Sequence, residues 1–222
     1  MTSFTYETLM EEGSRLLKSG SEFLAASRFE EAVVLASNRC QRASALQKLG
    51  IARRLNGELE VSEEIHNRAI ATAEDDILKA RIKRDLGMTY LDKGDYNLAY
   101  DILDISYRTL LNHHEPIEAA MSRGFQGRVK LLQGSRKQAV SLLREVDKVL
   151  RGGDNRDYEL NNLIWLMRAS YRTRFTGSWR AVRLIKQTEQ SRRWKELVVI
   201  IIGGNWLHTH SHRLYGFLRR HR

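Results

Sequence analysis

Three histidines near the end of the chain, His208, His210 and His212, have the spacing of a metal-binding run. On a strand all three would share one face, and on a helix His208 and His212 would lie one turn apart. Neutral imidazoles in either arrangement can bind zinc or nickel. No cysteine lies nearby, and the closest upstream carboxylate is Glu196, so a closed four-ligand site is not evident. A solvated basic tail is the favoured explanation of the run, and we expect no metal.

Other reactive residue types lack the context that catalysis needs. Cys40 is the one cysteine, which excludes an internal disulfide, and no local motif marks it as a nucleophile. Asp75-Asp76 and Glu63-Glu64 are paired carboxylates, but each pair is explained as charge at a helix end or on an exposed helical face. Neither a P-loop pattern nor G-x-G-x-x-G is present. The sequence therefore predicts no catalytic residue, no cofactor and no enzyme.

Length and composition predict a folded helical protein. The 222 residues are 42% hydrophobic and 29% charged, which argues against wholesale disorder. A single proline, Pro116, and 15 glycines favour long helices over a turn-rich β-sandwich. The N-terminus lacks the pattern of a secretory signal, and the longest apolar run, Leu197–Ile202, is too short to span a bilayer. We expect a cytoplasmic protein.

The positive charge is concentrated in the last third of the chain. Residues 1–150 carry 22 Lys and Arg against 22 Asp and Glu, whereas residues 151–222 carry 15 against 5. The last third also holds all four tryptophans, Trp165, Trp179, Trp194 and Trp206. Interleaved arginine and aromatic residues can follow phosphates and stack on bases, so this part is a candidate for binding RNA or a ribonucleoprotein. A solvated arginine-rich face, with tryptophans in the core, remains the alternative.

A pattern of paired glycines repeats along the chain. Gly13, Gly50 and Gly87 are 37 residues apart, as are Gly20, Gly57 and Gly94. The same seven-residue gap recurs at Gly127 and Gly134. A small residue lies five positions after the second glycine of each pair. A residue that is mostly larger lies nine positions after it, and a small or medium one lies twelve positions after it. In chain order the sets are Ala25, Ser62, Ala99, Ala139; Phe29, His66, Leu103, Leu143; and Ala32, Ala69, Ser106, Val146.

Each repeat has the pattern of two helices. The first glycine falls inside a helix, where glycine costs roughly 1 kcal/mol relative to alanine, so we expect a close packing contact at that point. The second glycine ends the first helix, since it adopts a left-handed conformation freely. The apolar face of one such hairpin is covered by the next, which predicts an α-solenoid.

The segment DLGMTYLDKGDYNLAYDIL, Asp85 to Leu103, resembles a tetratricopeptide repeat, through Leu86, Gly87, Tyr90, Gly94, Tyr96 and Ala99. The family has a shorter usual period and ends its units with proline, whereas this chain has a period of 37 or more and lacks those prolines. The resemblance implies an all-α right-handed superhelix of stacked antiparallel hairpins. It places repeats at about 5–39, 42–76, 79–113 and 116–153, a degenerate unit at 158–191, and a basic capping segment or tail at 192–222.

The resemblance also implies a concave groove lined by the first helix of each hairpin. The positions carried over from the family are mostly basic, amide or apolar. They are Gln47, Lys48, Arg54, Arg81, Arg84, Met88, Met121, Phe125, Arg128, Arg168, Tyr171 and Arg174. Arginine beside Met, Phe and Tyr suits a peptide groove that binds carboxylates and apolar side chains. Met88 and Phe125 could instead belong to the core, as could Leu132, a further position carried over from the family.

Three functions follow from these observations. The leading prediction is a non-catalytic interaction module or adaptor that binds an acidic or amphipathic peptide or partner protein in the groove. The alternatives are nucleic-acid binding by residues 151–222, and a peptide-sensing regulatory protein of the kind that long-period repeats form in bacteria. The lysine-and-asparagine clamp of chaperone-binding repeats is mostly missing at Met10, Ser14, Lys48, Arg81 and Asp85, which disfavours a cochaperone.

Overall fold

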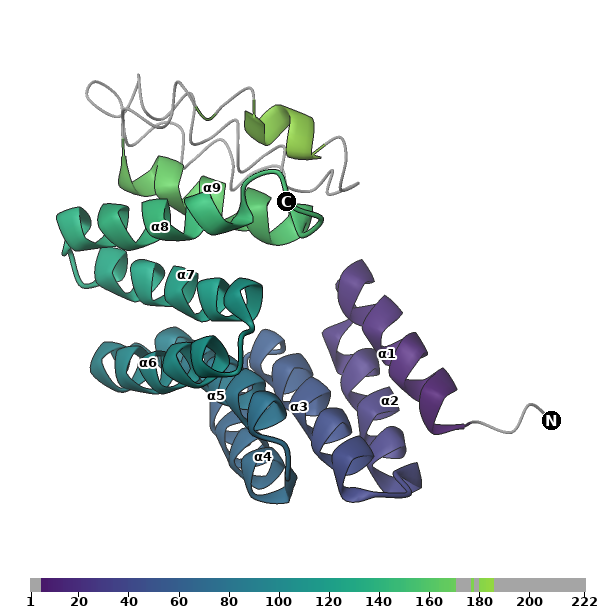
Figure 1. Ribbon diagram of the computed structural model, residues 1–222. Helices are drawn as coiled ribbons and strands as arrows, with labels where there is room; N and C mark the ends of the chain where they lie inside the picture. Colours follow the sequence, from purple (N-terminus) through teal and green to yellow (C-terminus); the bar gives the residue numbers. More distant parts are fainter. Residues whose placement is uncertain (1–4, 171–176, 178–179, 186–222) are drawn as a thin grey trace. The chain divides into compact units, whose positions relative to one another are not determined.

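The computed structural model describes residues 5–170, 177 and 180–185. All regular elements in this part of the chain are helical, which confirms the predicted all-α class (Figure 1). They are α1 (Tyr6–Ser19), α2 (Glu22–Leu35), α3 (Arg39–Leu55), α4 (Leu59–Thr72), α5 (Asp76–Lys93), α6 (Tyr96–Asn112), α7 (Pro116–Leu132), α8 (Arg136–Leu150) and α9 (Arg156–Ala169). None of these helices is both long enough and apolar enough to cross a membrane. The predicted tail at 192–222, with its histidine run, lies outside the described residues.

The chain divides into two compact units, residues 1–133 and 134–222. The boundary falls between α7 and α8, within the range predicted as the fourth hairpin. The first unit therefore holds α1 to α7, and the second begins with α8 and α9.

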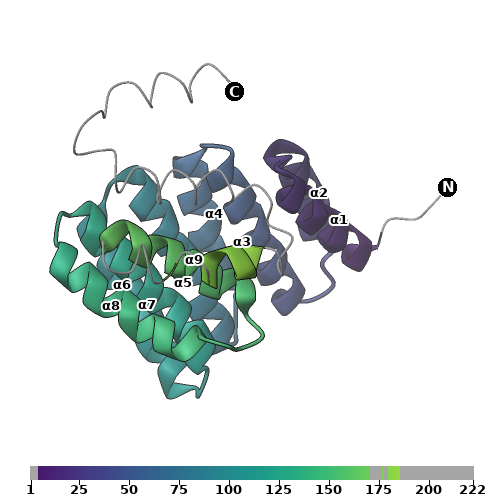
Figure 2. The same cartoon turned by 90° about the horizontal axis from the view of Figure 1, so that it is seen from above.

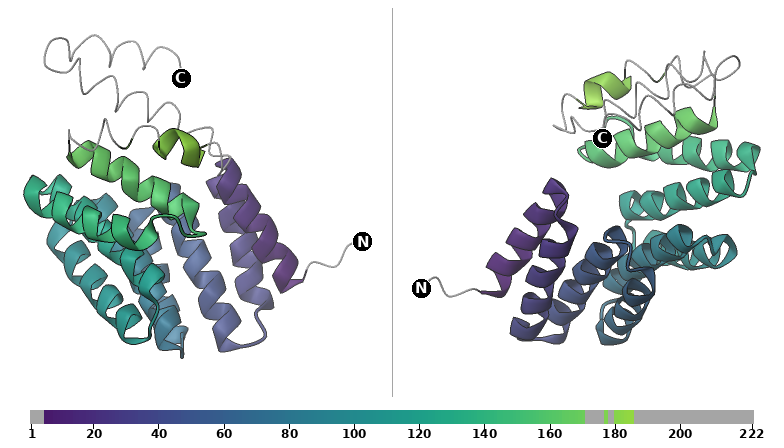
Figure 3. Two further views of the ribbon diagram at one scale, coloured as in Figure 1. Left: turned by 45° about the horizontal axis from the view of Figure 1, so that its top comes forward. Right: turned by 180° about the vertical axis from the view of Figure 1, so that it is seen from behind.

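In the first unit, each helix packs against the next along the chain, from α1 to α7 (Figures 1 and 2). Helices α1, α3, α5 and α7 also contact one another in order, α1 with α3, α3 with α5, and α5 with α7. We call the surface formed by these four the first-helix face; two further views of the stack appear in Figure 3. This arrangement is the stacking of antiparallel hairpins that the glycine pattern predicts.

The second glycine of each pair ends a first helix in a left-handed conformation. Gly20, Gly57 and Gly94 have φ angles of 78°, 87° and 87°, and Gly134 has 80°. At the end of α1 the Gly20 amide donates to the carbonyls of Leu16 and Leu17. An L side chain rarely adopts this backbone conformation, so the recurrence of glycine here has a direct conformational cause.

In the hairpins α1–α2, α3–α4 and α5–α6, the first glycine of the pair lies inside a helix, directly against a large side chain of the next helix. A Cβ added to Gly13 would lie 2.6 Å from Cε1 of Phe29, and one on Gly50 would lie 2.6 Å from Nε2 of His66. One on Gly87 would lie 2.7 Å from Cγ of Leu103. The two helices of each hairpin thus approach more closely than any side chain at the glycine would permit.

The repeated positions of the second helices form the core. The small residues five after the second glycine and the larger ones nine after it are fully buried, including Ala25, Ser62, Phe29 and Leu103. Where a serine replaces alanine, its hydroxyl donates to a backbone carbonyl: Ser62 to Gly50 at 2.8 Å. Burial of these hydroxyls is therefore compensated by a hydrogen bond.

The second unit has a core of its own. Helices α8 and α9 pack side by side, and the Asn162 side chain donates to the Leu143 carbonyl at 3.0 Å. Apolar residues of α9 pack against a short segment that follows it. The cluster consists of Leu160, Leu163, Ile164, Met167, Ala181, Leu184 and Ile185.

Replacing Gly13 by alanine should lower the free energy of unfolding by roughly 1–3 kcal/mol, because the new methyl group overlaps the Phe29 ring. At an exposed helical position the same change would stabilise by about 1 kcal/mol. Urea denaturation followed by circular dichroism measures the difference.

The matched background is Phe29→Ala, in which the ring that blocks the methyl group is gone. The double variant Gly13→Ala with Phe29→Ala should be more stable than the single variant Phe29→Ala. A stabilising effect of Gly13→Ala with Phe29 in place would contradict the packing argument.

Candidate functional site

The predicted binding positions of α3 lie next to carboxylates of α5. The Gln47 amide donates to Oδ2 of Asp85 at 2.6 Å, and Nη1 of Arg54 lies 2.5 Å from Oδ2 of Asp92. Both pairs join residues one repeat apart. They place donors and acceptors side by side on the first-helix face.

A third connection of this kind joins α5 to α7. Arg84 forms an ion pair and hydrogen bond with Glu118, and Nη2 of Arg81 lies 3.6 Å from the other oxygen of the same carboxylate. Arg84 is only 7% exposed, whereas the side chain of Arg81 is 39% exposed. Arg84 therefore holds two helices together, while Arg81 retains contact with solvent. We call these interactions between α3, α5 and α7 the polar ladder.

The remaining predicted groove residues of the first unit differ in exposure. Met88 and Met121 are buried, at 9% and 6%. Phe125 is partly buried and carries the guanidinium of Arg128 over its ring, 4.5 Å from the centroid. Lys48 is partly exposed and forms no ion pair within the described residues. The two methionines thus belong to the packing beneath the first-helix face rather than to its surface.

Leu132 differs from the other two residues considered as core candidates. Its side chain is 48% exposed at the end of α7, and Leu55 at the end of α3 is equally exposed. Apolar surface is therefore available at the C-terminal ends of α3 and α7.

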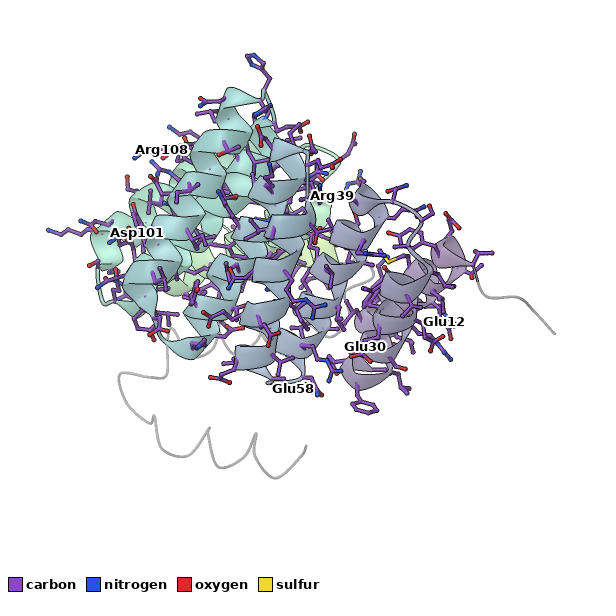
Figure 4. All side chains as sticks on the ribbon, turned by 90° about the horizontal axis from the view of Figure 1, so that it is seen from below. Glu12, Glu30, Arg39, Glu58, Asp101 and Arg108 are labelled. Atoms are coloured by element: carbon purple, nitrogen blue, oxygen red, sulfur yellow. The ribbon has the colours of Figure 1, made fainter. Side chains whose placement is uncertain are left out.

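Polar contacts on the other side of the first helices were not expected from the sequence. Arg53 pairs with Glu30 of α2 and, at 2.7 Å, with Glu58 before α4; Figure 4 shows both carboxylates. Glu63 of α4 accepts from Nζ of Lys93 at 2.7 Å and from the Tyr90 hydroxyl at 2.9 Å. The hydrogen bond from Lys93 lowers the pKa of Glu63. Adjacent residues such as Arg53 and Arg54 point in different directions from a helix. Which carboxylate each one meets depends on how the neighbouring helices pack, which the sequence alone does not give.

An open pocket of about 390 Å³ lies between α2, α3 and α4. Its walls include Val33, Val34, Leu46, Val61 and Ile65, and charged residues stand at its rim. Val34 is 80% exposed, so this apolar surface is in contact with solvent. None of the residues that line this pocket belongs to the polar ladder.

In the second unit, basic residues predicted as nucleic-acid contacts pair with buried carboxylates. Asp147 is 5% exposed and bonds to Arg180 and, at 2.6 Å, to Arg151. Burial would raise the pKa of Asp147, but the hydrogen bonds from the two arginines lower it. Nε of Arg180 also lies 3.2 Å from Glu159. These two arginines stabilise the unit itself.

Arg168, from the predicted fifth unit, stacks its guanidinium over the Trp165 ring, 4.6 Å from the centroid. Tyr171 and Arg174 lie outside the described residues. Cys40 is exposed. Within the described ranges, no group of three or more His, Cys, Asp or Glu side chains has the arrangement of a metal site.

No family model matches the chain, and no curated protein does. Solved structures do. A putative kinesin light chain of Podosopora anserina with TPR-like repeats has a TM-score of 0.57 and 19% identity, over 86% of this chain and 95% of that one. The Rap conjugation gene regulator of plasmid pLS20, in complex with the Phr* peptide, has a TM-score of 0.81 and 14% identity. It is matched over 97% of this chain, which spans 62% of the regulator.

A third similar structure is the apo form of RapI, with a TM-score of 0.71 and 12% identity, over 97% of this chain and 81% of that one. At such identities the likeness concerns the fold. It agrees with the helix pairs and the paired glycines described above. The chain is thus an all-α protein built from tetratricopeptide-like repeats.

Proposed function

We propose that the first-helix face binds an acidic peptide, or an extended acidic segment of a partner protein, without catalysis. The observation that carries this proposal is the polar ladder. Its hydrogen bonds and ion pairs hold charged and amide side chains in fixed positions across α3, α5 and α7. Side chains that are ordered before binding lose less conformational entropy when a ligand arrives.

The exposures of the basic residues indicate which of them serve the ligand. Lys48 has no ion pair among the described residues, and Arg81 contacts Glu118 at only 3.6 Å. A guanidinium has five N–H donors, so Arg81 can bind a second carboxylate while it stays near Glu118. Arg84, by contrast, is nearly buried and already bonded. We assign the acidic groups of the ligand to Lys48 and Arg81.

We assign the apolar part of the ligand to exposed leucines at the C-terminal ends of these first helices. Leu55 and Leu132 are each 48% exposed at the ends of α3 and α7. Burying such a side chain against a partner contributes roughly 1.5–3 kcal/mol when burial is complete. A segment with alternating acidic and aliphatic residues would use both kinds of contact.

A role in peptide sensing extends this proposal. One protein of similar fold is a conjugation gene regulator whose structure contains a peptide. This chain spans 62% of that regulator and shares 14% identity with it. The likeness therefore supports a similar arrangement of helical repeats, and it does not indicate the same ligand. The proposal is therefore an interaction module or adaptor, with regulation as its extended form.

The double variant Lys48→Glu with Arg81→Glu should lose binding to acidic peptides, because both cations become repulsive. The measurement is selection of a random peptide library on the immobilised full-length protein, followed by affinity measurement of the enriched peptides. The unmodified protein should enrich sequences rich in Asp and Glu. The double variant should bind those peptides at least tenfold more weakly.

Arg108→Glu is the matched control, since Arg108 projects from α6 and is 75% exposed (Figure 4). This variant should bind the same peptides with unchanged affinity, and circular dichroism should show that all the variants fold. Equal binding by the double variant and the unmodified protein would exclude the proposed site. Failure to enrich any peptide would exclude peptide binding by this face.

Nucleic-acid binding by residues 151–222 is the second candidate, and the stacking of Arg168 on Trp165 favours it. If this part contacts phosphates, the logarithm of the association constant for a generic single-stranded RNA should fall linearly with the logarithm of salt concentration, with a slope near −0.7 for each phosphate contacted. Fluorescence anisotropy at several salt concentrations measures the slope. Absence of binding at about 10 mM salt would exclude the candidate.

A further inference from the structure

His66 is a fully buried imidazole at the joint between α3, α4 and α5. Its Nδ1 lies 3.3 Å from the Ser62 hydroxyl and 3.4 Å from the Thr89 hydroxyl. Its Nε2 is buried and has no hydrogen-bond partner. The ring packs against Gly50, where a side chain would overlap it. One nitrogen of the ring is thus buried away from water and makes no hydrogen bond in the native packing.

The equivalent positions in the neighbouring hairpins are apolar. Phe29 packs against Gly13, and Leu103 packs against Gly87, in the way that His66 packs against Gly50. All three side chains are 0% exposed. A neutral imidazole can occupy this apolar position, but an imidazolium has a donor on each nitrogen and a full charge.

Charged groups face His66 from two of the three helices of the joint. Burial disfavours the charged imidazole most strongly and lowers its pKa from 6.5 to about 4. Asp85 of α5 and the backbone of Gln47 in α3 favour the charged form, whereas Arg54 of α3 disfavours it. The nearest polar group on α4 itself is the neutral Ser62 hydroxyl. The charges of Asp85 and Arg54 act in opposite directions, so the lowering of the His66 pKa by burial is not offset.

We propose that His66 makes the joint between α3, α4 and α5 sensitive to acid, so that proton uptake by the imidazole separates these helices. The proton adds to the neutral ring, and the new N–H at Nε2 makes no hydrogen bond in the native packing, where the nearby backbone of Gln47 offsets the cost of burial only in part. The ring reaches water only if α4 moves away from α3 and α5. The proposal is independent of what the first-helix face binds.

The sign of the pH dependence follows from the lowered pKa. In the unfolded chain the imidazole has its ordinary pKa, so below pH 6.5 the unfolded state takes up a proton that the native state resists. The free energy of unfolding therefore keeps its full value, as far as His66 is concerned, above pH 6.5. It decreases as the pH falls from 6.5 to about 4, and His66 changes it no further below about pH 4. Between pH 7.5 and pH 5 the folding equilibrium constant should fall by about 30-fold through His66 alone.

The test compares urea unfolding of the full chain at pH 7.5 and pH 5 for three proteins. These are the unmodified chain, His66→Leu, which has the residue of the third hairpin, and His113→Gln, which alters an exposed histidine. Carboxylates titrate in all three, so differences between the proteins isolate the histidine. Between pH 7.5 and pH 5, the folding equilibrium constant of His66→Leu should fall about 30-fold less than that of the unmodified chain. The fall for His113→Gln should equal that of the unmodified chain. Equal pH effects in His66→Leu and the unmodified protein would overturn the proposal.

A second measurement does not depend on the stability of the leucine variant. The ¹⁵N shifts of the imidazoles in the native protein report protonation directly, and the His66 signals are assigned by their absence from His66→Leu or His66→Gln. The His66 ring should remain neutral in the folded protein at pH 5.5. A folded protein in which this ring titrates near pH 6.5, with α3, α4 and α5 still packed, would also overturn the proposal.

Discussion

The first unit depends on the close approach of the two helices within each hairpin. Gly13, Gly50 and Gly87 provide it, because each takes up a large side chain of the next helix where any Cβ would overlap. Packing of this kind fixes the rotation of both helices about their axes. The rotation in turn decides which residues of α3 and α5 reach the first-helix face. The polar ladder is therefore a consequence of a steric constraint elsewhere in the repeat.

The contacts within hairpins and those between hairpins have different chemistry. Within a hairpin, the glycine contact is with a buried ring or aliphatic side chain. Between consecutive first helices, Arg54 with Asp92 and Arg84 with Glu118 add charged contacts. An ion pair at an exposed position commonly contributes less than about 1 kcal/mol. Arg84 is nearly buried, so loss of Glu118 would leave its charge unpaired between the helices and cost more. Apolar burial thus holds each hairpin together, and the ladder joins the helices that carry Lys48 and Arg81, which we assign to a ligand.

Much of the fold could be predicted because it follows from local rules. The left-handed caps at Gly20, Gly57 and Gly94 and the buried positions five, nine and twelve residues later are properties of single hairpins. The partners of the arginines could not be predicted in the same way. Arg53 and Arg54 are adjacent in the sequence but pair with carboxylates of different helices, Glu30 of α2 and Asp92 of α5. Met121 is a comparable case, since its burial depends on how α5 and α7 pack.

The spacing of the contacts bears on how such a protein can gain or lose repeats. Each glycine and its bulky partner are sixteen residues apart, so they are inherited together whenever a hairpin is duplicated or deleted. The ion pairs of the ladder join residues of adjacent hairpins and would be mismatched at a new junction. Repeat number can therefore change over evolution without loss of the fold, while the recognition surface must be rebuilt by point mutation after each such event.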